Sequence, residues 1–92
     1  MSAAILLSIQ GKVQGVGYRA WARREARKHG VRGWVRNRGD GSVEALIIGD
    51  EPAVAAMAAA CRRGPLWAQV IEVSESAAAD DGCVDFSESP DA

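Results

Sequence analysis

Three glycines and an arginine mark the part of the sequence most suited to binding an anion. Gly11, Gly15 and Gly17 separate an apolar segment from an amphipathic one, and Arg19 follows two residues after the last glycine. Glycine-rich turns let successive N–H groups point inward, a helix start adds partial positive charge, and a guanidinium binds phosphate oxygens through its planar fork. The spacing matches neither a Walker A loop nor a dinucleotide-binding loop. Two interpretations remain open: a phosphate-binding loop, or a tight turn whose arginine faces solvent.

Asn37 is the second residue whose type and position indicate chemistry. Asparagine is disfavoured inside strands, yet Asn37 closes a segment that alternates as a strand does. Its carboxamide offers a donor and an acceptor without charge, which suits the positioning of a water molecule. The alternative is that Asn37 only prepares the turn formed by Gly39, Asp40 and Gly41.

Hydrophobic periodicity predicts the elements that must position these residues. Strict alternation predicts a strand, and an apolar stripe with a 3.6-residue period predicts a helix. Gly30 and the pair Gly64 and Pro65 are typical helix stops. In chain order we expect a strand at 5–10, a helix at 18–29, strands at 31–38 and 42–48, a helix between 50 and 64, and a strand with a bulge at 67–73.

The C-terminal region is less regular. Residues 74–82 are small and polar, so we expect a loop there. Val84 and Phe86 are candidates for a short fifth strand. The acidic tail at 87–92 is expected to fray, as chain ends without apolar anchors do.

The expected elements follow the order βαββαβ, an α+β arrangement in which two helices cover one face of an antiparallel sheet. Because crossover connections are right-handed, the first and third strands lie side by side, and the third runs back between the first and the second. The first and second strands then end at the same edge of the sheet. We therefore expect the glycine loop at 11–17 to approach Asn37, although twenty positions separate Gly17 from Asn37.

Length and composition restrict the class of protein. The 92 residues suit one small domain, residues 1–92, and 48% hydrophobic with 25% charged residues is ordinary globular composition. Two cysteines and His29 are too few for a zinc site or a disulfide scaffold, so we expect no metal and no cofactor. The apolar run at 3–7 is too short for a membrane span. We expect a cytoplasmic monomer with no membrane partner.

Charge divides the chain into two unlike parts. Residues 1–38 carry nine Lys or Arg and a single acid, whereas residues 39–92 carry two basic and eleven acidic residues, although the net charge is only −1. Either the basic part surrounds an anion site, or basic and acidic elements neutralise one another in space. The near-neutral balance argues against a nucleic-acid partner, because general nucleic-acid binders have strongly basic domains.

Four short blocks lie within the range from about Ile5 to Val73: Gly15-Val16-Gly17-Tyr18-Arg19, Gly33-Trp34-Val35-Arg36-Asn37, Asp40-Gly41-Ser42-Val43-Glu44, and Gly64-Pro65 with Ala68. Together these blocks resemble the acylphosphatase family. The first two blocks are highly specific when they occur together at this spacing. The family has a ferredoxin-like α/β sandwich fold and hydrolyses the carboxyl-phosphate bond of acyl phosphates.

The resemblance implies a role for each matching site residue. Arg19 would bind the phosphate of an acyl phosphate substrate, and Asn37 would orient the water that releases inorganic phosphate. Tyr18 departs from the family, which more often has Phe there, and its hydroxyl needs a partner. The backbone amides of the loop would form the phosphate cradle, which comprises Gln14, Gly15, Val16, Gly17, Tyr18 and Arg19.

Two other functions remain as alternatives to hydrolysis. A non-enzymatic module of the same fold would bind an anion or a protein partner with the same elements. An RNA-binding sheet would need aromatic side chains on its central strands, where only Trp34 fits. Release of inorganic phosphate from an acyl phosphate discriminates the enzyme from both.

Overall fold

Five strands and two helices make up the computed structural model, which describes residues 1–92. Their order confirms the predicted βαββαβ arrangement and adds the fifth strand at the end. They are β1 (Ser2–Lys12), α1 (Tyr18–His29), β2 (Arg32–Asn37), β3 (Val43–Asp50), α2 (Glu51–Arg63), β4 (Gln69–Ala77) and β5 (Phe86–Glu88).

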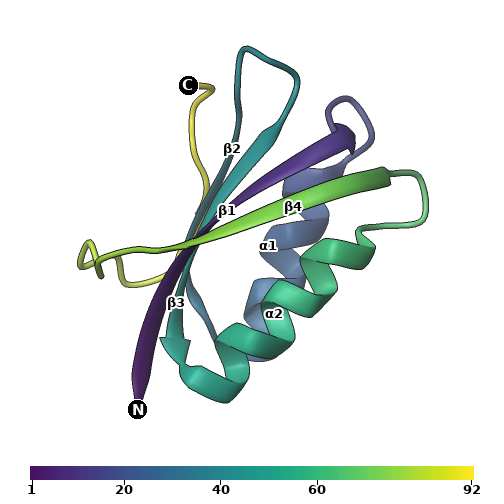
Figure 1. Cartoon of the computed structure of the whole chain (residues 1–92). Coiled ribbons are helices and arrows are strands. Elements are labelled where there is room, and N and C mark those ends of the chain that lie inside the picture. Colours follow the sequence, from purple (N-terminus) through teal and green to yellow (C-terminus); the bar gives the residue numbers. More distant parts are fainter.

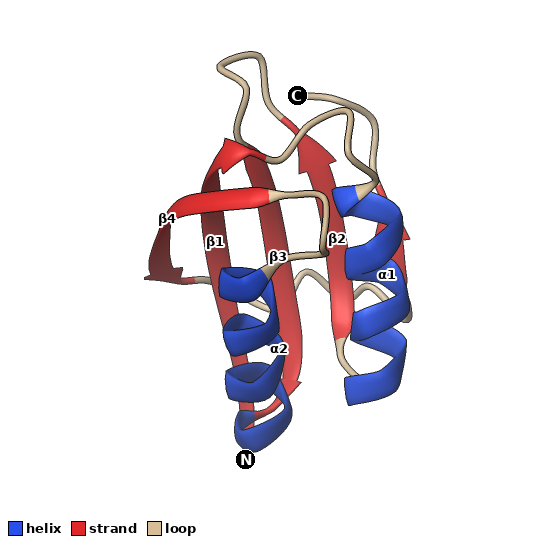
Figure 2. Cartoon of the chain, turned by 90° about the vertical axis from the view of Figure 1, so that its right-hand side faces the viewer, coloured by secondary structure: helices blue, strands red, loops and turns tan.

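The sheet and the helices form two layers. The strand order is β4-β1-β3-β2-β5, and both helices cover the same face of the sheet (Figure 1 and Figure 2). β3 runs antiparallel between β1 and β2, as right-handed crossovers require. The C-terminal ends of β1 and β2 therefore lie at the same end of the sheet. The β1–α1 connection, the β2–β3 turn and the C-terminus all lie at that end of the molecule (Figure 2).

The apolar stripe of each helix packs on the inner face of the sheet. Tyr18, Ala22 and Ala26 form the buried stripe of α1, as its periodicity predicts. Because Tyr18 is the first residue of α1, this packing fixes the start of the helix relative to the sheet. The other buried residues of the core are Leu7, Ile9, Val13, Val31, Val35, Val43, Ala45, Ile47, Val54, Met57, Ala58, Cys61 and Phe86.

β4 contains the predicted bulge, but it begins and ends later than the sequence predicts. Its register against β1 shifts between Gln10 and Gly11, which leaves Ile71 as the extra residue. Gly11 permits the close approach, since a Cβ there would lie 2.0 Å from the carbonyl oxygen of Gln69. Residues 74–77, predicted as a loop, continue the strand. Their polar composition is compatible with pairing because β4 is an edge strand with mostly exposed side chains.

The acidic C-terminal segment is held against the fold, so the prediction that it frays is wrong. β5 pairs with β2 in parallel, whereas the other strand pairs are antiparallel. Phe86 anchors this segment in the core. The amide of Ser89 donates to the carbonyl of Val35 at 2.8 Å, and the amide of Ala92 donates to the carbonyl of Asn37 at 2.9 Å. These bonds bring the segment to the end of β2.

Ion pairs join the basic and acidic parts of the chain, which favours neutralisation in space for most of the charge. They involve arginines of α1 and β2, and most of the paired side chains are partly exposed to solvent. The pairs are Arg23 with Glu88, Arg27 with Asp85, Arg32 with Asp80, and Arg36 with Glu44.

No helix has the length and apolar character that crossing a membrane requires.

Candidate active site

The cradle loop, residues 13–17, joins β1 to α1 and is anchored at both ends. Val13 is buried in the core before the turn, and Tyr18 is buried directly after it. Gly15 and Gly17 have φ angles of 74° and 79°, in the left-handed region that glycine enters without the strain a Cβ would cause. The glycine spacing therefore allows a tight turn between two fixed points.

The backbone amides from Val13 to Ala20 donate no hydrogen bond to any other atom of the chain. Gly17 caps α1 without a side-chain acceptor, and the first turn of α1 contains no acidic residue. The first N–H groups of a helix have no partner within the helix, and they carry the positive end of its dipole. The cradle loop and the start of α1 thus present unpaired donors suited to an anion.

Arg19 and Asn37 line the same hollow, of about 140 Å³, between the cradle loop and the end of β2. Arg19 is the second residue of α1, and Asn37 is the last residue of β2. Their position confirms the expectation that the glycine loop approaches Asn37. The complete lining is Val13, Gly15, Gly17, Tyr18, Arg19, Ala20, Asn37 and Glu88.

Two of the predicted cradle positions, Gln14 and Val16, do not line this hollow. Val16 is partly buried against the hydrophobic core. The side chain of Gln14 extends to the β2–β3 turn, where it donates to the carbonyls of Arg38 and Ser42 at 2.7 and 2.8 Å. The predicted positions that do line the hollow are Gly15, Gly17, Tyr18 and Arg19.

The hydroxyl of Tyr18 has the partner that the sequence requires. It donates to the carbonyl of Cys61 at 2.7 Å, in the last turn of α2. The carbonyl groups in the last turn of a helix have no N–H donor within the helix, so the hydroxyl of Tyr18 supplies a donor to one of them. Burial raises the pKa of Tyr18 above its ordinary value, which keeps the hydroxyl protonated as a donor. The bond joins the start of α1, and with it Arg19, to the end of α2.

Tyr18→Phe is expected to lower the free energy of unfolding by about 1–3 kcal/mol, because the buried carbonyl of Cys61 loses its partner. Urea denaturation at neutral pH measures the difference. A free energy of unfolding equal to that of the wild type would show that this carbonyl is satisfied without the hydroxyl.

Two acidic side chains that sequence reasoning missed lie beside the predicted site. Oδ1 of Asp91 is 3.3 Å from Nη1 of Arg19, with the two side chains 64% and 35% exposed. Glu88 lines the hollow, and its Oε2 is 3.6 Å from Nε of Arg23. The acidic composition of the tail was the only available signal, and composition does not specify which carboxylate approaches a guanidinium. Asp91 contacts the group that an anionic ligand would use.

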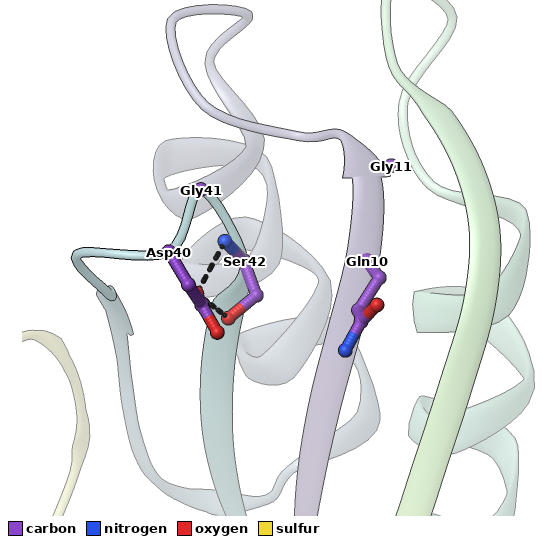
Figure 3. A pocket seen from close by; sticks show the side chains of 5 residues that line it. All are labelled: Gln10, Gly11, Asp40, Gly41 and Ser42. Carbon is purple, nitrogen blue, oxygen red and sulfur yellow. Dashed lines mark hydrogen bonds between the residues drawn. The ribbon is translucent and has the colours of Figure 1, made fainter.

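A larger hollow of about 320 Å³ lies between the end of β1 and the β2–β3 turn (Figure 3). Its lining contains no basic side chain and comprises Gln10, Gly11, Asp40, Gly41 and Ser42. Asp40 accepts a hydrogen bond from the amide of Ser42 at 2.9 Å, and the two side chains face each other across the turn in Figure 3. Hydrogen bonds from Ser42 hold the pKa of Asp40 below its ordinary value, so this hollow carries negative charge at neutral pH. It is unsuited to an anion, which places the candidate site at the hollow beside Arg19.

The structure contains no group of three or more His, Cys, Asp or Glu side chains that could hold a metal ion. The charged and polar groups that line the candidate site are one guanidinium, one carboxamide, one carboxylate and backbone amides. This donor set suits a phosphoryl or carboxylate group held by hydrogen bonds.

Comparisons with known proteins match this chain to one family. The family model for Acylphosphatase matches residues 5–87. An acylphosphatase of Bradyrhizobium diazoefficiens is 57% identical over 83 residues, which cover 88% of this chain and 84% of that protein. The solved structure of an acylphosphatase from Bacillus subtilis has a TM-score of 0.90 at 34% identity and covers 97% of this chain and 99% of that chain. One from Coxiella burnetii has a TM-score of 0.91 at 28% identity, covering 96% and 93%. The chain belongs to the acylphosphatase family.

Proposed function

We propose that this acylphosphatase cleaves acyl phosphates to a carboxylate and inorganic phosphate, with Arg19 and the cradle loop holding the phosphoryl group and Asn37 orienting water. One observation carries the assignment of residues: a guanidinium, a carboxamide and a glycine loop whose amides have no partner in the chain line one hollow. The family supplies the substrate class.

The chemistry asks little of the protein beyond positioning and electrostatics. An acyl phosphate has a carboxylate leaving group, which departs without a strong general acid. In phosphoryl transfer the remaining tasks are to neutralise the equatorial oxygens and to align the nucleophile with the leaving group. The fork of Arg19 and the amides of the cradle loop perform the first task. The carboxamide of Asn37, on the wall formed by β2, performs the second.

The reaction balances without a covalent intermediate. The oxygen of water forms a bond to phosphorus while the bond from phosphorus to the carboxylate oxygen breaks. The electron pair of that bond leaves with the carboxylate. A proton of the water passes to a phosphate oxygen, so the site needs no separate base.

The direct test is turnover of benzoyl phosphate by the wild-type protein. Benzoate and inorganic phosphate are expected in equal amounts, with added inorganic phosphate acting as a competitive inhibitor because it binds the same cradle. Absence of turnover with phosphate still bound would favour the non-enzymatic anion-binding module. Absence of both would contradict the site itself.

Asp91→Asn is expected to strengthen inhibition by inorganic phosphate by up to about fivefold at low salt. The carboxylate of Asp91 competes for Arg19, and an exposed ion pair of this kind is worth about 0–1 kcal/mol. Asp85→Asn is the matched control, since Asp85 pairs with Arg27, two turns further along α1. Weaker inhibition in Asp91→Asn would mean that the carboxylate orients Arg19 for phosphate and does not compete with it.

The face of the sheet away from the helices is poorly suited to RNA, which supports the proposal that the protein has no RNA partner. Trp34 is the aromatic residue that the sequence places there, and the guanidinium of Arg36 lies 4.7 Å from its ring centre. The indole N–H of Trp34 donates to Asp81 at 3.3 Å, which adds negative charge beside the ring. An RNA base would have to displace the arginine and approach this carboxylate. The names of the relatives also favour the hydrolase over a non-enzymatic module.

We further propose that the protein acts as a monomer in the cytoplasm. Both cysteines are free thiols, which suits a reducing compartment. Burial is the main cause that raises the pKa of both Cys61 and Cys83 to about 11, so neither is a reactive thiolate at neutral pH. Light scattering of the purified protein would measure the mass of one chain, and the mass of two would contradict the monomer.

A further inference from the structure

The side chain of Gln14 provides the hydrogen bonds between the cradle loop and the β2–β3 turn. Its Nε2 donates to the carbonyl of Arg38 at 2.7 Å and to the carbonyl of Ser42 at 2.8 Å. No backbone hydrogen bond joins residues 13–17 to residues 37–42. Both N–H groups of the carboxamide are therefore used in one link between two loops.

The two acceptors of Gln14 are fixed within the turn. The amide of Arg38 donates to the carbonyl of Ser42 at 2.9 Å, and the amide of Gly41 donates to the carbonyl of Arg38 at 3.2 Å. Each carbonyl thus accepts one bond from the backbone of the turn and one from Gln14. Gln14 is consequently attached to a closed turn.

Each end of this link adjoins a residue that lines the candidate site. Gln14 immediately precedes Gly15 on the cradle side, and Arg38 immediately follows Asn37 on the β2 side. Gln14 itself does not line the hollow. The link therefore connects a residue next to the loop wall of the hollow with a turn next to its β2 wall.

We infer that the side chain of Gln14 is a positioning residue for Asn37, a role that rests on the proposed function. Attack on phosphorus requires the water to lie in line with the leaving carboxylate, and a displacement of about 1 Å costs up to about 10²-fold in rate. The carboxamide of Gln14 holds the end of β2 at the distance from the cradle loop that this alignment needs. It acts through geometry and does not touch the substrate.

Gln14→Met tests the inference because it removes both donors and keeps the length of the side chain. The kcat for benzoyl phosphate is expected to fall about 10- to 100-fold. The inhibition constant of inorganic phosphate is expected to change by less than about twofold, the tolerance within which separate contacts act independently, because Arg19 and the loop amides remain. Gln10→Met, on the exposed side of β1, is the matched control and leaves both constants unchanged.

Gln14→Glu is a second variant that keeps the shape of the side chain. Its carboxylate has no donor and faces the carbonyl oxygens of Arg38 and Ser42, so kcat is expected to fall at least as far as in Gln14→Met. A kcat equal to that of the wild type in both variants would overturn the inference.

A double-mutant cycle separates positioning from a general loss of structure. In the Asn37→Ala background, Gln14→Met is expected to lower kcat by less than about twofold, because no oriented water remains to be misaligned. An equal fall in both backgrounds would overturn the inference and leave the role of Asn37 intact. A kcat of Asn37→Ala near the wild-type value would contradict the proposed function and, with it, the positioning role of Gln14.

Discussion

Replacing Asn37 with alanine is expected to lower kcat for benzoyl phosphate by about 10²–10³-fold, the loss typical of one preorganised group at a reacting centre. The water loses the carboxamide that aligns it, while Arg19 and the cradle loop still hold the phosphoryl group. The inhibition constant of inorganic phosphate is therefore expected to change little. Steady-state kinetics with benzoyl phosphate, with and without added phosphate, measures both quantities.

The fold of the Asn37→Ala variant is expected to survive. The bond between the end of β2 and the C-terminal segment uses the backbone carbonyl of Asn37, which the substitution retains. Gln10→Ala removes a carboxamide from a residue outside the candidate site and provides the control. Near-normal turnover of Asn37→Ala would remove Asn37 from the mechanism.

Arg19→Lys is expected to weaken the binding of both substrate and inorganic phosphate by about 10- to 100-fold. Lysine keeps the positive charge but loses the planar fork, and a hydrogen bond to a charged group is worth about 1.5–3 kcal/mol. The value of kcat/KM is expected to fall further than binding alone requires, because the fork also stabilises charge in the transition state. Isothermal titration with inorganic phosphate, together with kinetics, separates the two effects.

Arg24→Lys is the matched control for this prediction, because Arg24 lies on the same helix and is exposed. The free energy of unfolding is expected to change by less than about 1 kcal/mol in Arg19→Lys, since the partner of Arg19 is the exposed carboxylate of Asp91. Phosphate binding as tight as in the wild type would disprove the role given to Arg19.

Helix α1 was predicted at its observed bounds because both of its ends depend on local chemistry. Gly17 at its start and Gly30 at its end have φ angles of 79° and 70°, a conformation that glycine tolerates better than any other residue. The bonds from Gly30 to the carbonyl of Arg27 and from Val31 to that of Ala26 form within a few residues of each other. The residues that form these helix ends are neighbours in the sequence, so the sequence alone predicts them.

The later part of β4 and the C-terminal segment were mispredicted because their structure depends on distant partners. Residues 74–77 carry no apolar alternation, and they form a strand through pairing with residues 5–8 of β1. The tail at 87–92 is polar, and it is held by backbone bonds to β2 and by the buried side chain of Phe86. Backbone pairing at the edge of a sheet demands little of the side chains, so composition does not reveal it.

Local sequence patterns were enough to predict the resemblance to the family, the order of the elements and the approach of the glycine loop to Asn37. Right-handed crossovers allow one arrangement of these strands, which brings the ends of β1 and β2 to the same edge. The side-chain contacts across long separations became visible in the folded chain alone: Gln14 with the β2–β3 turn, Tyr18 with Cys61, and Arg19 with Asp91, 72 positions away. These contacts repeat no local pattern, because each depends on where two independently anchored segments come to lie.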